Sequence, residues 1–275
     1  MPDIKPFFAG PNELWNNIFP ATQYAYLMES ERVGTPGFDI ANWHGRANAK
    51  LFRAISDIYS DDRTKYETVC ESWCADTPSN SNNRMNSARY LTEPGVVAGD
   101  AAKFWTTAAA VAPYIGPLYY NTATETAMAT EWASATDARK TELETEYMLA
   151  EGASADARVW VNRKAQILAW VEWAISFGLK SFWYEGGLQT NIAGTGGTVG
   201  AFRDAAKKAP ITYWLTHRAY QYFASIGGQY PAHYNFAGRS TWSLFDADIY
   251  DTPSPQWNAI VDWSQGKRAI LFRAA

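Results

Sequence analysis

The chain has 275 residues, of which 47% are hydrophobic and 15% are aromatic, enough for one large domain or two small ones to bury a core. Its 24 basic and 28 acidic residues give a formal net charge of −4. Because this charge creates no cationic field, we expect neither nucleic acid nor an anionic membrane as a partner.

The first part of the chain predicts a strand, two helices and a second strand. The short apolar run 4–10 predicts a strand, and 20–32 predicts a helix with Pro20 in its first turn. Apolar residues spaced three and four apart predict a second helix over 47–60. The run 66–74, YETVCESWC, has the composition of a strand.

The rest of the chain continues this alternation. Gly178 and Gly227 are placed to end helices, and Pro210 is placed to begin one. The expected elements are, in chain order, strand 106–114, helices 122–150 and 154–177, strand 179–185, helix 210–225, strand 240–245 and helix 255–264.

Strands that recur between long helices predict parallel βα units. Parallel strands that are covered by helices and closed on themselves form a (β/α)8 TIM barrel, whose catalytic groups lie at the carboxyl ends of the strands. We therefore expect residues 1–275 to form a single α/β domain, an incomplete TIM-barrel-like fold of about five βα units. Glu13 and Glu185 each follow an expected strand directly.

Two glutamate motifs resemble those of a known enzyme superfamily. An Asn-Glu pair after one strand and a single glutamate after a later aromatic strand resemble the clan-A retaining glycoside hydrolases, the four/seven superfamily. In that superfamily the acid/base ends strand four and the nucleophile ends strand seven. The segments NELWNNIFPATQYA, APYIG and WYEGG resemble more closely a group of largely uncharacterised bacterial members, over most of the chain and in the same order. The resemblance implies that Glu13 is the acid/base and Glu185 the nucleophile.

The chemistry explains why two carboxyl groups are needed. Retaining hydrolysis of an oligo- or polysaccharide uses two carboxyl groups about 5 to 5.5 Å apart, one as nucleophile and one as acid and then base. A barrel can bring together residues far apart in the sequence, because the strand ends converge on one face. Gly186 and Gly187 follow Glu185 and leave room for a sugar ring.

The resemblance also implies roles for neighbouring residues. Asn12 matches the asparagine that binds the sugar 2-hydroxyl, Tyr114 the tyrosine that steadies the nucleophile, and Trp242 the tryptophan under the sugar. Further candidates for lining the cleft are Trp73, Trp183, Tyr184 and Gln189. For every aromatic residue the alternative is core packing. The alternative for Glu185 is a structural ion pair, and for Glu13 a charge at a helix N-terminus.

Neither a metal nor a cofactor is expected. If 66–74 is a strand, Cys70 and Cys74 lie too far apart for a disulfide and are interpreted as packing thiols. The three histidines occur singly, away from ligand spacing. The glycine-rich segment 194–197 has no phosphate-loop lysine, which favours a flexible loop over the cleft.

The sequence leaves the compartment open. It has no basic-plus-apolar leader and no run of about eighteen apolar residues, so we expect neither a signal peptide nor a membrane span. An extracellular location would fit a chain that is part of a longer protein.

The resemblance places the first strand of this chain at barrel strand four, so strands one to three are expected to lie elsewhere. An open parallel edge needs a cover, and an upstream segment or a partner chain completing the barrel would supply it. The alternative is a reduced, repurposed relative in which these strands do not occur. Two other functions stay open. One is a non-catalytic carbohydrate-binding module, and the other is a structural domain of a larger assembly.

Overall fold

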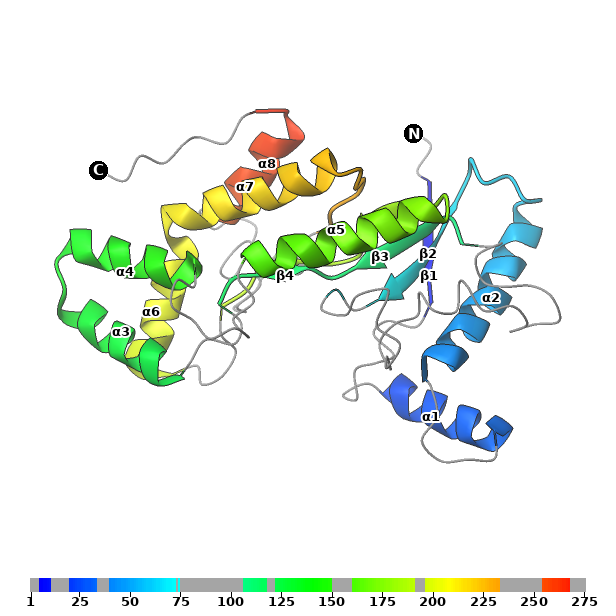
Figure 1. Cartoon of the computed structure of the whole chain (residues 1–275), viewed down its shortest axis with the longest axis horizontal. Coiled ribbons are helices and arrows are strands. Elements are labelled where there is room, and N and C mark those ends of the chain that lie inside the picture. Colours follow the sequence, from blue (N-terminus) through cyan, green and yellow to red (C-terminus); the bar gives the residue numbers. More distant parts are fainter. Residues whose placement is uncertain are drawn as a thin grey trace. The chain divides into compact units, whose positions relative to one another are not determined.

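The computed structural model describes residues 5–10, 20–33, 40–72, 74, 106–117, 122–149, 160–190, 196–232 and 254–267 (Figure 1). The strands are β1 (Phe7–Ala9), β2 (Glu67–Ser72), β3 (Ala108–Val111), β4 (Tyr114–Ile115), β5 (Lys180–Trp183) and β6 (Gly187–Leu188). The helices are α1 (Pro20–Val33), α2 (Ile40–Ile58), α3 (Thr122–Ser134), α4 (Asp137–Leu149), α5 (Trp160–Ser176), α6 (Gly197–Lys208), α7 (Pro210–Ser225) and α8 (Pro255–Ser264).

The chain divides into two compact units. Unit 1 comprises Met1–Ala112, Gln166–Tyr184 and Gly227–Tyr230. Unit 2 comprises Pro113–Ala165, Glu185–Ile226 and Pro231–Ala275. The expectation of a single domain over 1–275 stays a prediction.

Most expected elements are present. The first four expected strands contain β1, β2, β3 and β5, and the helices predicted at 210–225 and 255–264 have the bounds of α7 and α8. The segment 122–150 forms two helices, α3 and α4, where the sequence predicts continuous helical pattern. Helix α6 and the short strands β4 and β6 were not predicted. The fifth expected strand, 240–245, lies outside the described residues.

Unit 1 contains a parallel sheet whose four strands follow chain order, β1-β2-β3-β5. Since parallel crossovers are right-handed, connections that always step in the same direction place their helices on one face. The core agrees with this rule. On that face Cys70 and Ala109 pack with Ala49 of α2 and Ala174 of α5. The mixed α/β prediction with a parallel sheet is therefore confirmed, while a closed barrel is not seen in the described part of the chain.

The opposite face of this sheet carries an aromatic cluster. The rings of Phe7 and Phe182 lie 5.5 Å apart between centroids, although β2 and β3 separate their strands. Tyr230 contacts both rings, at 5.7 Å from Phe7 and 4.9 Å from Phe182. Neighbouring strands are about 4.8 Å apart, so β1 and β5 of a flat sheet would be separated by roughly 14 Å. The small residues Ala108 and Ala110 on β3 leave room for the rings of Phe7 and Phe182 to meet across the two intervening strands. The short distance between the rings indicates that the sheet curves toward this face.

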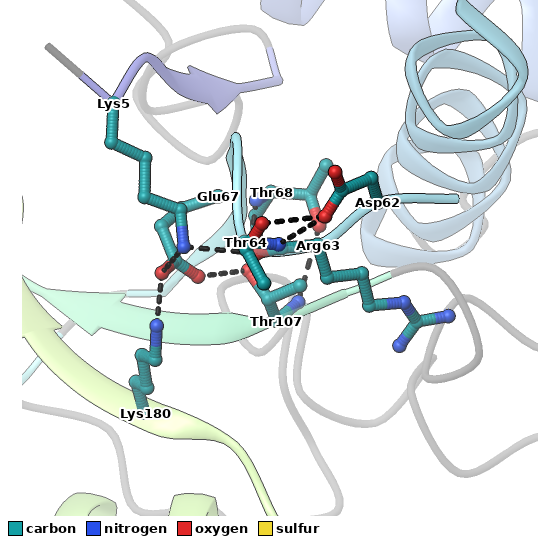
Figure 2. Close-up of polar contacts among 8 residues, drawn as sticks. All are labelled: Lys5, Asp62, Arg63, Thr64, Glu67, Thr68, Thr107 and Lys180. Carbon is teal, nitrogen blue, oxygen red and sulfur yellow. Dashed lines mark hydrogen bonds and ion pairs between the residues drawn. The ribbon is translucent and has the colours of Figure 1, made fainter. Parts of the chain in front are cut away.

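An ion cluster joins the amino ends of the strands in unit 1. Glu67, which is 2% exposed, accepts hydrogen bonds from Lys5 Nζ at 2.6 Å, from Thr107 Oγ1 at 2.5 Å and from Lys180 Nζ. Figure 2 shows the three donors converging on this carboxylate. Burial alone would raise the pKa of Glu67, but the hydrogen bonds from Lys180, Lys5 and Thr107 outweigh burial and hold the pKa below its ordinary value. Since catalytic groups of such sheets lie at carboxyl ends, we interpret Glu67 as structural.

This cluster predicts a pH-dependent contribution to stability. The folded pKa of Glu67 is lower than 4.5, so its contribution is present above that pH and is lost as the pH falls through the folded pKa. We expect Glu67→Gln to lower the free energy of unfolding by about 2 kcal/mol or more at neutral pH, since bonds to a charge are lost. Urea unfolding at several pH values should show this deficit shrinking below pH 4.5. A deficit that stays constant down to about pH 3 would contradict the charge argument.

Unit 2 is built around a buried ion pair between helices. Arg203 of α6 donates from Nε and Nη2 to the two carboxylate oxygens of Glu125 in α3, both at 2.6 Å. Tyr147 of α4 donates to Glu125 Oε1 at 2.7 Å. The three residues are 0% to 4% exposed and lie beside an apolar core that includes Leu143, Phe202 and Leu215. This triad therefore links α3, α4 and α6.

Candidate functional site

The candidate site lies in unit 2, where two short strands pair. Strand β4 pairs in parallel with β6, and their register aligns Tyr114 with Gly187. The backbone N–H of Gly187 donates to Pro113 O at 3.3 Å, and that of Gln189 donates to Ile115 O at 2.7 Å. This pairing places Tyr114 beside the segment that begins with Glu185.

The structure brings Tyr114 and Glu185 into direct contact. The phenol of Tyr114 donates a hydrogen bond to Glu185 Oε1 at 2.6 Å, and both side chains are half-buried. A hydroxyl that donates to an oxygen at this distance forms a charge-assisted bond when the carboxyl is ionised, and it favours that ionised form. The bond also restricts the rotamer of Glu185. Such a carboxylate is suited to act as a nucleophile or to stabilise a positive charge.

Glycines shape the backbone at both ends of this strand pair. Gly186 has φ +155°, and a Cβ there would lie 3.0 Å from Pro113 O. Gly116 has φ +116°, and its Cβ would lie 2.6 Å from Gln189 O. A side chain at Gly116 would collide with the backbone of Gln189, and one at Gly186 would make an unusually tight contact with Pro113, so the close approach of the two segments is favoured by glycine.

We expect Gly116→Ala to lower the free energy of unfolding by about 2 to 3 kcal/mol, because strain at positive φ adds to a backbone clash. Gly266→Ala is the matched control: it has φ +69° but no atom within 4 Å of the added Cβ. Gly266→Ala should lower the free energy of unfolding by only about 1 kcal/mol, because it introduces the strain at positive φ without a clash. Denaturant unfolding of both variants measures the difference. Equal losses would contradict a close approach of Gly116 to Gln189.

The other predicted lining residues that the structure describes are mostly buried. Trp183 is 1% exposed and Gln189 4% exposed, so each contributes to packing in this structure. Tyr184 is half-buried and packs in unit 1 against the cluster of Val69, Ala108, Ala110 and Phe182. The remaining predicted site residues, Asn12, Glu13, Trp73 and Trp242, lie outside the described residues.

Two buried charged residues, one in each unit, were not singled out from the sequence. Arg163 of α5 is 2% exposed and donates from Nε to the backbone carbonyl of Tyr114 at 3.0 Å. In unit 1, Glu71 is 6% exposed near the carboxyl end of β2, in register with Ala110. The glutamate of CESWC could have drawn attention to this position, because a charge inside an expected buried strand is uncommon. A contact with a backbone carbonyl leaves no comparable sequence pattern for Arg163.

Comparisons with protein-family models, curated proteins and solved structures give no match. The resemblance to glycoside hydrolases therefore rests on the sequence motifs alone. In the described part of the chain, no group of three or more His, Cys, Asp or Glu side chains is placed to hold a metal ion. None of the helices described there is long and apolar enough to cross a membrane.

Proposed function

We propose that this chain hydrolyses glycosidic bonds in an oligo- or polysaccharide by a retaining double-displacement mechanism, on an incomplete (β/α)8 barrel. The observation that carries the proposal is the 2.6 Å hydrogen bond from Tyr114 to Glu185. It joins the tyrosine and the glutamate to which the resemblance assigns adjoining roles. The half-buried setting of both residues adds support, since it combines partial desolvation with access.

The fold lends further support. The strands of unit 1 follow chain order in a parallel sheet, and helices α2 and α5 pack on the same face of it. A singly wound arrangement of this kind is typical of (β/α)8 barrels, whereas doubly wound sheets reverse their strand order. An upstream segment or a partner chain would complete the barrel.

In the proposed reaction, Glu185 attacks the anomeric carbon while Glu13 donates its proton to the leaving oxygen. The bond to the leaving group breaks as the bond from the Glu185 carboxylate forms, giving a glycosyl ester. Glu13, now a carboxylate, takes a proton from water, and the hydroxyl displaces Glu185 from the anomeric carbon. Tyr114 would hold Oε1 of Glu185 in one place through both steps.

The test is a panel of aryl β-glycosides and soluble polysaccharides incubated with the purified chain, with sugar binding measured in parallel. Hydrolysis with retained anomeric configuration is the expected result. Binding without hydrolysis would instead favour a carbohydrate-binding module. A chain that neither binds nor hydrolyses any of the sugars would favour a structural role.

A further inference from the structure

We propose that Arg163 is a positioning residue for the candidate site: it holds β4 where Tyr114 can reach Glu185. This inference deepens the proposed function and rests on it. The described contact of Arg163 that supports this role is with the main-chain carbonyl of Tyr114.

The direction of the backbone groups supports this role. The carbonyls of Pro113 and Ile115 accept hydrogen bonds from the β6 segment. Because successive carbonyls of a strand point to opposite sides, the carbonyl of Tyr114 faces the other edge of β4. There it accepts the bond from Arg163 Nε at 3.0 Å. In the described residues the sheet of β4 and β6 has two strands, so Arg163 takes the place that a third strand would hold.

The strand pair is short, which makes this contact important. Strands β4 and β6 have two residues each, and an isolated two-stranded pair is marginally stable in water. The phenol of Tyr114 is fixed to this backbone, and its bond to Glu185 Oε1 is 2.6 Å long. Bonds this short depend on accurate placement, and displacements of about 1 Å at an active site can cost 100-fold in rate.

Arginine suits this position because its guanidinium is planar and holds its donors in fixed directions. Arg163 is 2% exposed, and a buried charge must be compensated by hydrogen bonds. Its guanidinium lies against the backbone of β4, the strand that carries Tyr114, so its positive charge also favours the ionised form of a carboxylate close to that strand. A residue with a structural role alone would affect stability but not the protonation of Glu185.

The test follows the protonation of Glu185 without requiring turnover. The full chain is labelled with glutamate carrying 13C in its carboxyl group, and the Glu185 signal is assigned by its loss in Glu185→Gln. Tyr114→Phe should move the titration midpoint of this signal upward by about 1 pH unit, because a donor to the carboxylate is lost. Arg163→Gln should raise this midpoint by a similar amount. The variant that combines Tyr114→Phe with Arg163→Gln should raise it little further than either single substitution. The midpoint in Arg163→Lys should lie between those of the wild type and Arg163→Gln.

Arg218→Gln is the matched control, since Arg218 is an exposed arginine of α7 in the same unit. It should leave the midpoint unchanged. A wild-type midpoint in folded Arg163→Gln would overturn the proposal. If Arg163→Gln fails to fold, Arg163→Lys decides: a raised midpoint supports the positioning role, and a wild-type midpoint overturns it.

Hydrolysis assays of the same variants separate this inference from the proposed function. If the wild type hydrolyses a glycoside, Arg163→Gln should lower kcat by about 10-fold or more with little change in KM. A wild-type kcat in that variant would overturn the positioning role. If the Arg163 and Tyr114 substitutions raise the Glu185 midpoint as expected but the wild type hydrolyses no glycoside, the positioning role of Arg163 is supported and the proposed function is rejected.

Discussion

Glu185→Gln is expected to lower glycoside hydrolysis by about 10⁴-fold or more, because the amide that replaces the carboxylate cannot form the glycosyl ester. Glutamine has nearly the same shape and can still accept the hydrogen bond of Tyr114 through its carbonyl oxygen. The free energy of unfolding should therefore change little. Steady-state kinetics on the most reactive aryl glycoside, with denaturant unfolding alongside, measures both effects.

Glu144→Gln is the control for this variant. Glu144 is also a half-buried glutamate of unit 2, and its Oε1 accepts a hydrogen bond from an aromatic donor, Trp132 Nε1, at 2.8 Å. It should keep full activity. Glu13→Gln should lose activity by about 10² to 10⁴-fold, the range for general acid–base catalysis. Full activity in Glu185→Gln would remove Glu185 from the mechanism.

Glu125→Gln is expected to lower the free energy of unfolding by about 3 to 5 kcal/mol, the usual effect of breaking a buried ion pair by removing one partner. The substitution leaves the guanidinium of Arg203 buried at 4% exposure without its counter-charge. It also replaces the carboxylate oxygen that accepts from Tyr147. Urea unfolding monitored by circular dichroism measures the loss.

The control for Glu125→Gln is Glu142→Gln. Glu142 pairs with Arg139 at 3.0 Å, but both side chains lie on the surface, at 63% and 37% exposure. Surface pairs contribute little, so this variant should unfold almost as the wild type does. Similar losses of unfolding free energy in the two variants would show that burial does not explain the contribution of the Glu125–Arg203 pair to stability.

Elements with strong local signals could be predicted from the sequence. Helix α7 begins with Pro210 and is followed by Gly227 at φ +100°, and helix α8 begins with Pro255 after Ser254, whose hydroxyl accepts from Trp257 N at 3.2 Å. These are the residues that favour helix ends, so both helices have the predicted bounds.

Elements that depend on tertiary contacts could not be predicted. Helix α6 begins with Gly197, and the glycines near its start indicated a loop. It is held by the buried side chains of Phe202, Arg203 and Ala206. The helical pattern 122–150 breaks near Thr136, whose hydroxyl accepts from Arg139 N at 3.4 Å. A hydroxyl cap inside an otherwise helical pattern is a weak signal.

The candidate site was predicted unevenly for similar reasons. The motif resemblance places Tyr114 and Glu185 in adjoining roles, and the structure brings their side chains together. Strands β4 and β6 have two residues each, too few for a periodic pattern to be detected. Arg163 lies in a helical pattern and acts on a main-chain carbonyl, so nothing in its neighbours identifies its partner.

The central claim is that Glu185 forms a covalent bond to the sugar. The most direct measurement is mass spectrometry of the chain quenched during turnover of an aryl glycoside with a good leaving group. We predict one glycosyl adduct on the peptide that contains Glu185, and no adduct in Glu185→Gln. Hydrolysis that proceeds without an adduct on Glu185, or with an adduct on another residue, would contradict the account.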